Sequence, residues 1–250
     1  MIYIDGDSCM YGSGIYQRLY GYNKFYTGRE ACERFRDGST QEANTDMNNQ
    51  RLKKKKIALK DVTYIETHNV IAQLKNKGID LKSGAAGGSS NQAIASRIVD
   101  AVLRYNAKTV IFCPTNFQRM LYPKPGPQSL TMGHANFNLE YKNYIKKWTR
   151  VFSFEQTMYL DTNALLGMIT FCKDNNVELL GVKTLLWNYT THDKNCEQIK
   201  RIIDQVNELC VFDLGSDLDD DEKRIYTACG HPNLGQHTKL AEDICTHLKI

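Results

Sequence analysis

The chain has 250 residues, of which 42% are hydrophobic and 24% charged, and its formal net charge is +4. These values are typical of a globular protein with one large domain or two small ones. No run approaches the ~20 apolar residues that a bilayer-spanning helix needs, and no basic segment followed by an apolar one marks a signal peptide. We therefore expect cytoplasmic synthesis and no membrane association, with export only inside a particle such as a phage virion or by lysis.

The cysteines and the basic residues exclude several kinds of site. None of the eight cysteines forms a Cys-x-x-Cys pair, so neither a zinc knuckle nor a thioredoxin-type redox site is expected, and we predict reduced thiols and no metal. The basic run at 51–56 carries five positive charges without interleaved aromatic residues. A solvated loop therefore fits this run better than a nucleic-acid site, although contact with phosphates is its alternative role.

Apolar segments and helical spacing alternate along the chain. A first strand begins at residue 1 and ends in the turn Asp5-Gly6-Asp7-Ser8, and further strands are predicted at 79–82, 109–113, 177–182 and 209–213. Helices are predicted at 62–77, 94–103, 138–152, 155–174, 198–208 and 234–248. We expect the proline-rich segment 117–133 to be an irregular loop, and segment 38–60 to be an insertion or flexible excursion.

Strands that alternate with helices favour a parallel sheet covered by helices. We expect one α/β domain over residues 1–250, with three layers and a flavodoxin-like sheet of five parallel strands in the order 2-1-3-4-5. In such a sheet, ligands bind beyond the carboxyl ends of the strands.

Four short polar segments should meet at that edge of the sheet. They contain Ser8 after the first strand, Gly88 after the second, Asn116 after the third and His231 after the last. A serine, a histidine and further donors are the groups that acyl transfer requires: a nucleophile, a general base and an oxyanion hole. Each segment alone is also consistent with an ordinary turn or helix cap.

The order and spacing of these segments resemble those of the SGNH hydrolases, the GDSL-like esterases. Gly6-Asp7-Ser8 matches the first block, and Gly88-Ser89-Ser90-Asn91 followed by Ile94 is similar to a second block seen in phage-encoded members. Asn116 stands where the third block has its asparagine, and 231–237 resembles the last block, with one extra residue before the second histidine. The resemblance implies the family's three-layer fold, Ser8 and His231 as catalytic residues, an oxyanion hole formed by Ser8, Gly88 and Asn116, and no cofactor.

Two positions depart from the family pattern. The aspartate that normally stands two or three residues before the histidine is replaced by Cys229 and Ala228, and Pro114-Thr115 replaces the usual glycine of the third block. That aspartate orients the imidazole, and its loss costs ~10⁴-fold in well-studied serine hydrolases. A carboxylate from the acidic loop 217–222 could replace it, but a Ser8–His231 dyad or an inactive site is the favoured interpretation.

Two functions are consistent with these residues. The first is a serine esterase or deacetylase that hydrolyses short acyl esters, such as those of an acetylated glycan. The second is a catalytically impaired binding or structural protein, for example a component of a phage particle. Arg119 is interpreted as a solvated side chain, with contact to an anionic substrate as its alternative, and His237 as a residue that caps or packs at the last helix. The sequence gives no oligomeric state.

Overall fold

The computed structural model describes the chain in several segments that form two units. The described residues are 1–11, 67–86, 89–117, 119–122, 128–130, 139–184, 187, 197–214, 232 and 234–250. The first unit comprises Met1–Met10 and Ile79–Ser216, and the second comprises Tyr11–Gly78 and Asp217–Ile250. The predicted insertion at 38–60 and the basic run at 51–56 lie outside the described residues, and a single domain over residues 1–250 stays a prediction.

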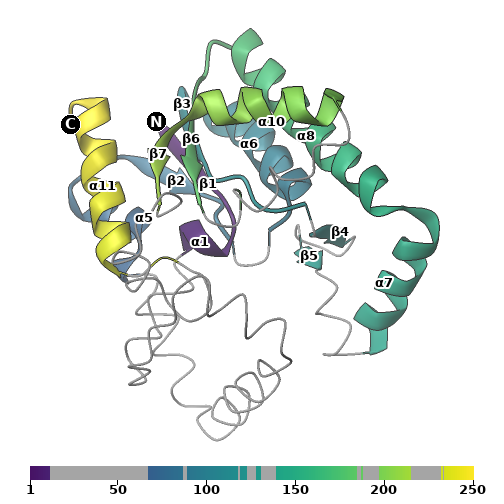
Figure 1. Cartoon of the computed structure of the whole chain (residues 1–250). Coiled ribbons are helices and arrows are strands. Elements are labelled where there is room, and N and C mark those ends of the chain that lie inside the picture. The colour runs from purple at the N-terminus through teal and green to yellow at the C-terminus, as the bar shows by residue number, and fades with distance from the viewer. Residues whose placement is uncertain are drawn as a thin grey trace, which may run out of the picture. The chain divides into compact units, whose positions relative to one another are not determined.

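The first unit is built on a sheet of five strands in the order β2-β1-β3-β6-β7 (Figure 1). The strands are β1 (Ile2–Asp5), β2 (Leu81–Ser83), β3 (Thr109–Phe112), β6 (Glu178–Lys183) and β7 (Cys210–Asp213). Every neighbouring pair is parallel. Numbered along the chain this is the order 2-1-3-4-5, so the predicted flavodoxin-like sheet is confirmed.

The central strands are apolar because both of their faces are covered. The partners Ile4 and Ile111 lie on one face of the ladder, the partners Tyr3 and Val110 lie on the other face, and all four side chains are buried. Burial on both faces is typical of central parallel strands. Asp5 closes β1 opposite Phe112, and this is the first charged side chain on the strand. The change from apolar to acidic residues therefore marks the carboxyl edge of the sheet.

Three helices of the first unit pack together against the sheet (Figure 1): α6 (Asn91–Tyr105), α8 (Phe154–Asp174) and α10 (Glu197–Leu209). Ser90 begins α6 by accepting a 3.2 Å bond from the Ala93 N–H, and Asn106 ends it in the left-handed conformation. Ser153 and Gln156 form a reciprocal capping box at the start of α8. These polar caps lie within a few residues of the helix starts predicted at 94 and 155.

Segment 117–133 differs from its prediction as an irregular loop. Strands β4 (Met120–Tyr122) and β5 (Gln128–Leu130) form a small antiparallel sheet within it. Pro123, Pro125 and Pro127 all fall between these strands in the sequence. Proline lacks a backbone N–H and interrupts a ladder, so it ends β4 without excluding strands on either side.

A buried aromatic pair lies in the core between sheet and helices. Phe117 and Trp187 meet edge to face with ring centroids 5.7 Å apart, and neither side chain is exposed. The Trp187 indole N–H donates a 2.8 Å bond to Oδ1 of Asn207 in α10. Phe117 lies five residues after the end of β3. The packing of this pair therefore holds in place the segment that follows β3 at the carboxyl edge of the sheet.

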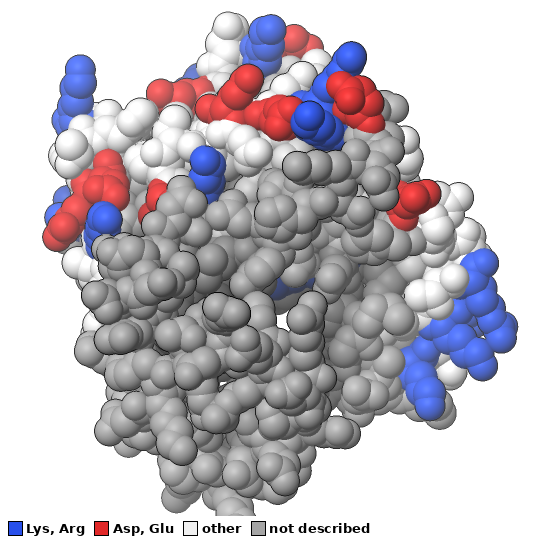
Figure 2. All heavy atoms as spheres, in the orientation of Figure 1, with Lys and Arg blue, Asp and Glu red and all other residues white. Residues whose placement is uncertain are grey.

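Helix α7 (Leu139–Val151) is amphipathic and carries a basic stripe. Its cations Lys142, Lys146, Lys147 and Arg150 are exposed, and Figure 2 shows basic side chains gathered over this helix. Ile145 is buried, and the Trp148 indole N–H donates a 3.3 Å bond to the Thr157 hydroxyl of α8. The apolar side of α7 is therefore used within the first unit, while its cations face solvent.

In the second unit, α5 (Val70–Asn76) packs against α11 (Leu234–Leu248). Nδ1 of the buried His237 accepts a 3.3 Å bond from the Val70 N–H at the start of α5. The prediction that His237 caps or packs is thus confirmed, since its ring nitrogen accepts from one of the first N–H groups of α5, which have no partner within the helix. No helix in the described ranges is both long and apolar enough to span a membrane.

Candidate active site

Ser8 follows the carboxyl end of β1 and is the first residue of the short helix α1 (Ser8–Tyr11). Its backbone is among the described residues and its side chain is not. The turn before it needs glycine, because a Cβ on Gly6 would lie 2.6 Å from Met10 Cγ and 2.9 Å from Cys113 Cβ. Tight packing on two sides thus fixes the path of the chain into Ser8.

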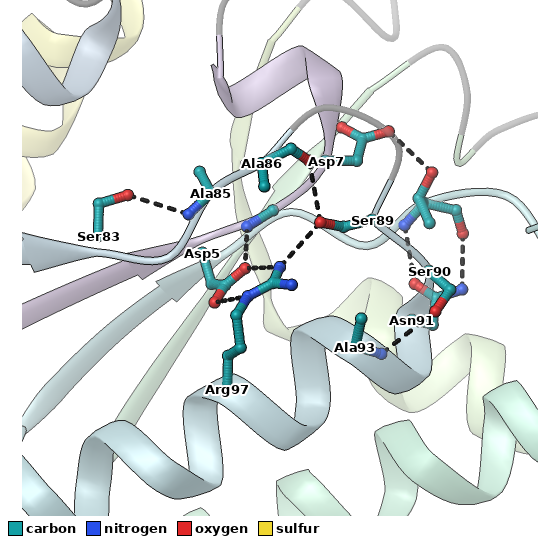
Figure 3. A network of polar contacts seen from close by, with 12 residues as sticks. Asp5, Asp7, Ser83, Ala85, Ala86, Ser89, Ser90, Asn91, Ala93 and Arg97 are labelled. Carbon is teal, nitrogen blue, oxygen red and sulfur yellow. Dashed lines mark hydrogen bonds and ion pairs between the residues drawn. The ribbon is translucent and has the colours of Figure 1, made fainter. Parts of the chain in front are cut away.

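Asp7 joins the turn after β1 to the turn after β3. Its fully buried carboxylate accepts a 2.8 Å bond at Oδ1 from the Cys9 N–H. Oδ2 accepts a 2.8 Å bond from the Thr115 hydroxyl (Figure 3) and lies 3.2 Å from Nη2 of Arg119. A buried carboxylate is stable only when its oxygens are paired in this way. Asp7, which directly precedes Ser8, therefore holds Thr115, which directly precedes Asn116.

Asn91 forms two further hydrogen bonds with Thr115, and we call these bonds and the Asp7–Thr115 bond the clamp around Thr115. Its Nδ2 donates to the Thr115 carbonyl, and its Oδ1 accepts from the Thr115 N–H, both at 2.8 Å. This reciprocal pair satisfies both backbone groups of a residue that lies outside any strand, as buried peptide groups require. The loop before α6 and the loop after β3 are consequently joined to the Ser8 turn, and Asn116 follows the clamped residue as a half-buried side chain.

Arg97 of α6 ties the end of β1 to the loop that leads into α6. Its Nε donates a 2.9 Å bond to Oδ2 of Asp5, and its Nη2 forms an ion pair with Oδ1 (Figure 3). The same Nη2 donates a 2.9 Å bond to the Ser89 hydroxyl, which in turn donates to the Ala86 carbonyl at 2.9 Å. Two parallel bonds to one carboxylate are the strongest geometry available to arginine. Ser89, which follows the predicted oxyanion donor Gly88, is held by this pair.

Burial raises the pKa of Asp5, and the Arg97 guanidinium with hydrogen bonds from Tyr3 and Gly6 opposes that rise. The Tyr3 hydroxyl donates a 3.0 Å bond to Asp5, and burial raises the pKa of Tyr3 above its ordinary value. A Cβ on Gly84 would lie 2.6 Å from Oδ2 of Asp5, so glycine lets the loop pass over this carboxylate. The Asp5 group is therefore a packed structural cluster at the base of the site.

Arg119 corrects the interpretation made from the sequence. The side chain is buried rather than solvated, and it reaches two segments of the site. Nη1 donates a 3.0 Å bond to the Ser89 carbonyl, and Nη2 pairs with Asp7. Spacing alone could not reveal this, because the hydrogen-bonding partners of Arg119 come from residues 30 and 112 positions earlier in the chain. Arg119 therefore links the turn after β1 to the loop before α6.

Two further ionisable groups lie near these turns. Asp161 of α8 is fully buried, and burial raises its pKa to about 7 against the lowering effect of its bonds from Gln92 and Asn91. Burial, with a contribution from Asp7, raises the pKa of the Cys113 thiol well above its ordinary value. Cys113 is therefore protonated at neutral pH, which makes it a poor nucleophile.

The structure brings together part of the predicted site. Ser8 and Asn116 follow the neighbouring strands β1 and β3 and are linked through Asp7 and Thr115. Gly88, His231 and the acidic loop 217–222 lie outside the described residues, as do Cys229, Ala228 and the Ser8 side chain. The catalytic and oxyanion roles of these residues stay predictions. Across the described ranges, no cluster of three or more His, Cys, Asp or Glu side chains is arranged to hold a metal ion.

Sequence reasoning missed the polar groups that support the turns. Asp161 had a detectable signal, because it lies among Met158, Thr162 and Leu165 on the buried side of α8, where a carboxylate is out of place. Arg97 likewise follows the apolar stripe of α6. The pairing of Asn91 with Thr115 had no signal, since the two residues are 24 positions apart in the chain.

No protein-family model and no curated protein matches the chain. Among solved structures, the chain is similar to the psychrotrophic esterase EstA from Pseudoalteromonas sp., with 12% identity, a TM-score of 0.45, and coverage of 99% of this chain and 96% of that one. It is also similar to a protein from Desulfitobacterium hafniense described as lipolytic and of the G-D-S-L family, with 12% identity, a TM-score of 0.44, and coverage of 96% and 95%. At these values we infer neither fold nor activity from the likeness; the strand order establishes the fold, and the function is inferred from this chain's own residues.

Proposed function

We propose that this protein is a serine esterase of the SGNH type that hydrolyses short acyl esters, including the acetyl esters of sugars. The observation that carries the proposal is the buried clamp around Thr115. Thr115 donates its hydroxyl to Asp7 and exchanges two hydrogen bonds with Asn91, and these bonds join the turn that carries Ser8, the start of α6 and the turn that carries Asn116. Buried, fully paired polar groups outside regular strands are typical of sites in which backbone donors must be held rigid.

In the proposed mechanism, Oγ of Ser8 attacks the acyl carbonyl carbon while His231 takes the hydroxyl proton. The N–H groups of Ser8 and Gly88 and the side-chain amide of Asn116 donate to the oxyanion. Collapse of the tetrahedral intermediate breaks the ester C–O bond, and His231 returns the proton to the leaving alcohol. A water molecule, deprotonated by His231, then attacks the acyl-Ser8 ester, and His231 returns this proton to Oγ of Ser8 as the carboxylic acid leaves.

The described residues support Ser8 rather than a thiol as the nucleophile. Cys113 also lies at the carboxyl edge, but burial keeps its thiol protonated. Cys9 is buried directly after Ser8 in α1. Neither thiol has the exposed, electropositive surroundings that a reactive cysteine needs.

Hydrolysis of a panel of nitrophenyl esters and acetylated sugars by the wild type, Ser8→Ala and Ser153→Ala tests the proposal. Ser153 is an exposed helix cap at α8, so its replacement serves as the control. We expect slow turnover of the shortest esters by the wild type and Ser153→Ala, and none by Ser8→Ala. Equal turnover by wild type and Ser8→Ala would contradict the proposal, and no turnover by any variant would favour a binding or structural protein, such as a phage particle component.

A further inference from the structure

Asp161 is a buried carboxylic acid that the proposed chemistry does not use. It lies in α8, two helical turns inside the helix start, and no part of it is exposed. A buried carboxyl is costly unless it is neutral or well paired. The partners of Asp161 are side chains of the first turn of α6, which begins directly after the loop of the candidate site.

Two amides donate to this carboxyl. Nε2 of Gln92 donates a 3.0 Å bond to Oδ1, and Nδ2 of Asn91 lies 3.4 Å from Oδ2. The same Nδ2 donates to the Thr115 carbonyl, while Oδ1 of Asn91 accepts from the Thr115 N–H. Asn91 is therefore a bridge between a carboxyl group in α8 and the turn that carries Asn116.

The amide of Asn91 can serve Thr115 in one orientation only. A flipped amide would place its oxygen against both the Thr115 carbonyl and the Asp161 carboxylate, and its NH₂ against the Thr115 N–H. An ionised carboxylate accepts hydrogen bonds and donates none, so it favours the NH₂ side of the amide. A protonated carboxyl can donate instead, and this preference weakens.

We propose that Asp161 is a positioning residue: its carboxylate orients Asn91, and Asn91 thereby holds the Thr115–Asn116 turn in the geometry that oxyanion binding requires. This inference rests on the proposed esterase function. Asp161 acts through Asn91 and Thr115 and does not touch the reacting atoms.

Burial brings the titration of Asp161 near neutral pH, and the described groups that oppose this shift are uncharged. Burial raises its pKa to about 7, and the opposing contributions come from the neutral amides of Gln92 and Asn91. Helix α8 also packs against α10 and β6, and no charged group on either element contributes to this shift among the described residues. The orienting carboxylate therefore forms as the pH rises through about 7.

Two variants of Asp161 and one control distinguish the loss of its hydrogen-bond acceptor from the loss of its negative charge. Asp161→Ala removes the acceptor, and we expect kcat for the shortest ester to fall at least tenfold with KM within about twofold of the wild type. Asp161→Asn keeps one acceptor for Asn91, since Gln92 can rotate its amide to meet the new NH₂, and we expect activity within about threefold of the wild type at pH 8. Thr162→Val is the matched control, because among the described residues its buried hydroxyl bonds within α8, to the carbonyls of Met158 and Tyr159.

The pH dependence of kcat is a further test, because replacing a residue with a purely structural role would not change it. In the wild type, both Asp161 and His231 should contribute to a rise in kcat near neutral pH. We expect Asp161→Asn to flatten the Asp161 part of this rise, while Thr162→Val keeps the wild-type profile. Full activity of Asp161→Ala, or a pH profile of Asp161→Asn identical to that of the wild type, would overturn the inference.

A second measurement does not require esterase activity. In NMR spectra recorded from pH 5.5 to 8.5, the side-chain NH₂ of Asn91 and the backbone N–H of Thr115 should shift together with a midpoint near 7, and Asp161→Asn should abolish that shift. Absence of the shift overturns the inference even if the protein is an esterase. A shift without Ser8-dependent turnover supports the coupling and separately contradicts the proposed function.

Discussion

The hydroxyl of Thr115 donates a 2.8 Å hydrogen bond to the buried carboxylate of Asp7, and this bond connects the turns that follow β1 and β3. Asp7 directly precedes Ser8, and Thr115 directly precedes Asn116. A contact between their neighbours thus sets the spacing between the predicted nucleophile and a predicted oxyanion donor. Misplacement of catalytic groups by about 1 Å can cost ~10²-fold in rate, so in the proposed mechanism this contact would affect catalysis without touching the substrate.

Thr115→Val should destabilise the protein, because it keeps the side-chain shape and leaves the buried Asp7 carboxylate without one of its donors. We expect the free energy of unfolding to fall by ~1–3 kcal/mol. The exposed Thr149, whose hydroxyl bonds its own helix α7, is the control, and Thr149→Val should change it by less than ~0.5 kcal/mol. Urea unfolding followed by circular dichroism measures the free energy of unfolding of both variants. Equal losses in the two variants would show that the Thr115–Asp7 bond does not stabilise the protein.

Arg97→Met should be more damaging, since it leaves Asp5 as a buried charge without its ion-pair partner. Removing one member of a buried pair costs about 3–5 kcal/mol. Arg104→Met is the matched control on the same helix, because the Arg104–Asp100 pair is largely exposed and such pairs contribute less than ~1 kcal/mol. Thermal unfolding of the two variants should differ by many degrees; similar melting temperatures would contradict the structural role given to the Asp5–Arg97 pair.

The raised pKa of Asp161 predicts how stability depends on pH. Its pKa is about 7 in the folded protein against an ordinary value of 3.8, so between these values the folded state holds a proton that the unfolded state has released. The stability that this proton contributes is present at low pH and is lost as the pH rises through about 7. At about 1.4 kcal/mol per pKa unit, the total loss is ~4 kcal/mol.

Asp161→Asn should remove this loss, because its side chain stays neutral. The variant should therefore be more stable than the wild type at pH 8, with the difference shrinking as the pH falls toward 4. Chemical unfolding at several pH values measures the difference directly. A difference that does not vary with pH would show that Asp161 does not titrate in this range.

Introducing the aspartate of the SGNH pattern tests the prediction that His231 lacks an orienting acid. If only the orienting acid for His231 is missing, Ala228→Asp or Cys229→Asp should raise the rate of ester hydrolysis at least tenfold. If neither change matters, while removing Asp217, Asp219, Asp220 or Asp221 lowers the rate, the acid comes from loop 217–222 instead. Initial rates on nitrophenyl acetate distinguish the two cases.

The sequence predicted the sheet well because each strand is a short apolar run between turn residues. Ile4 and Ile111 lie on strands buried on both faces, and the helical spacing of apolar residues placed α6 and α8. The β4–β5 pair was missed because the prolines between its strands outweighed two short runs of three residues.

The supporting network of the site could not be predicted from local patterns. Thr115 and Asp7 are separated by 108 residues, and Arg97 and Asp5 by 92. Such pairs depend on which turns the sheet order brings together. Arg119 was misjudged for the same reason, since an arginine in a polar segment is usually solvated unless the fold supplies a buried carboxylate.

The most direct test of the central claim is the labelling of Ser8 by a fluorophosphonate, with the modified peptide identified by mass spectrometry. Attack by an activated serine on phosphorus displaces fluoride and leaves a stable phosphonyl ester, so labelling reports the nucleophile without knowledge of the substrate. We predict one modified serine, at Ser8, with labelling lost in Ser8→Ala and retained in Ser153→Ala. Folded wild-type protein that stays unmodified at Ser8, or that is modified at another serine, would contradict the account.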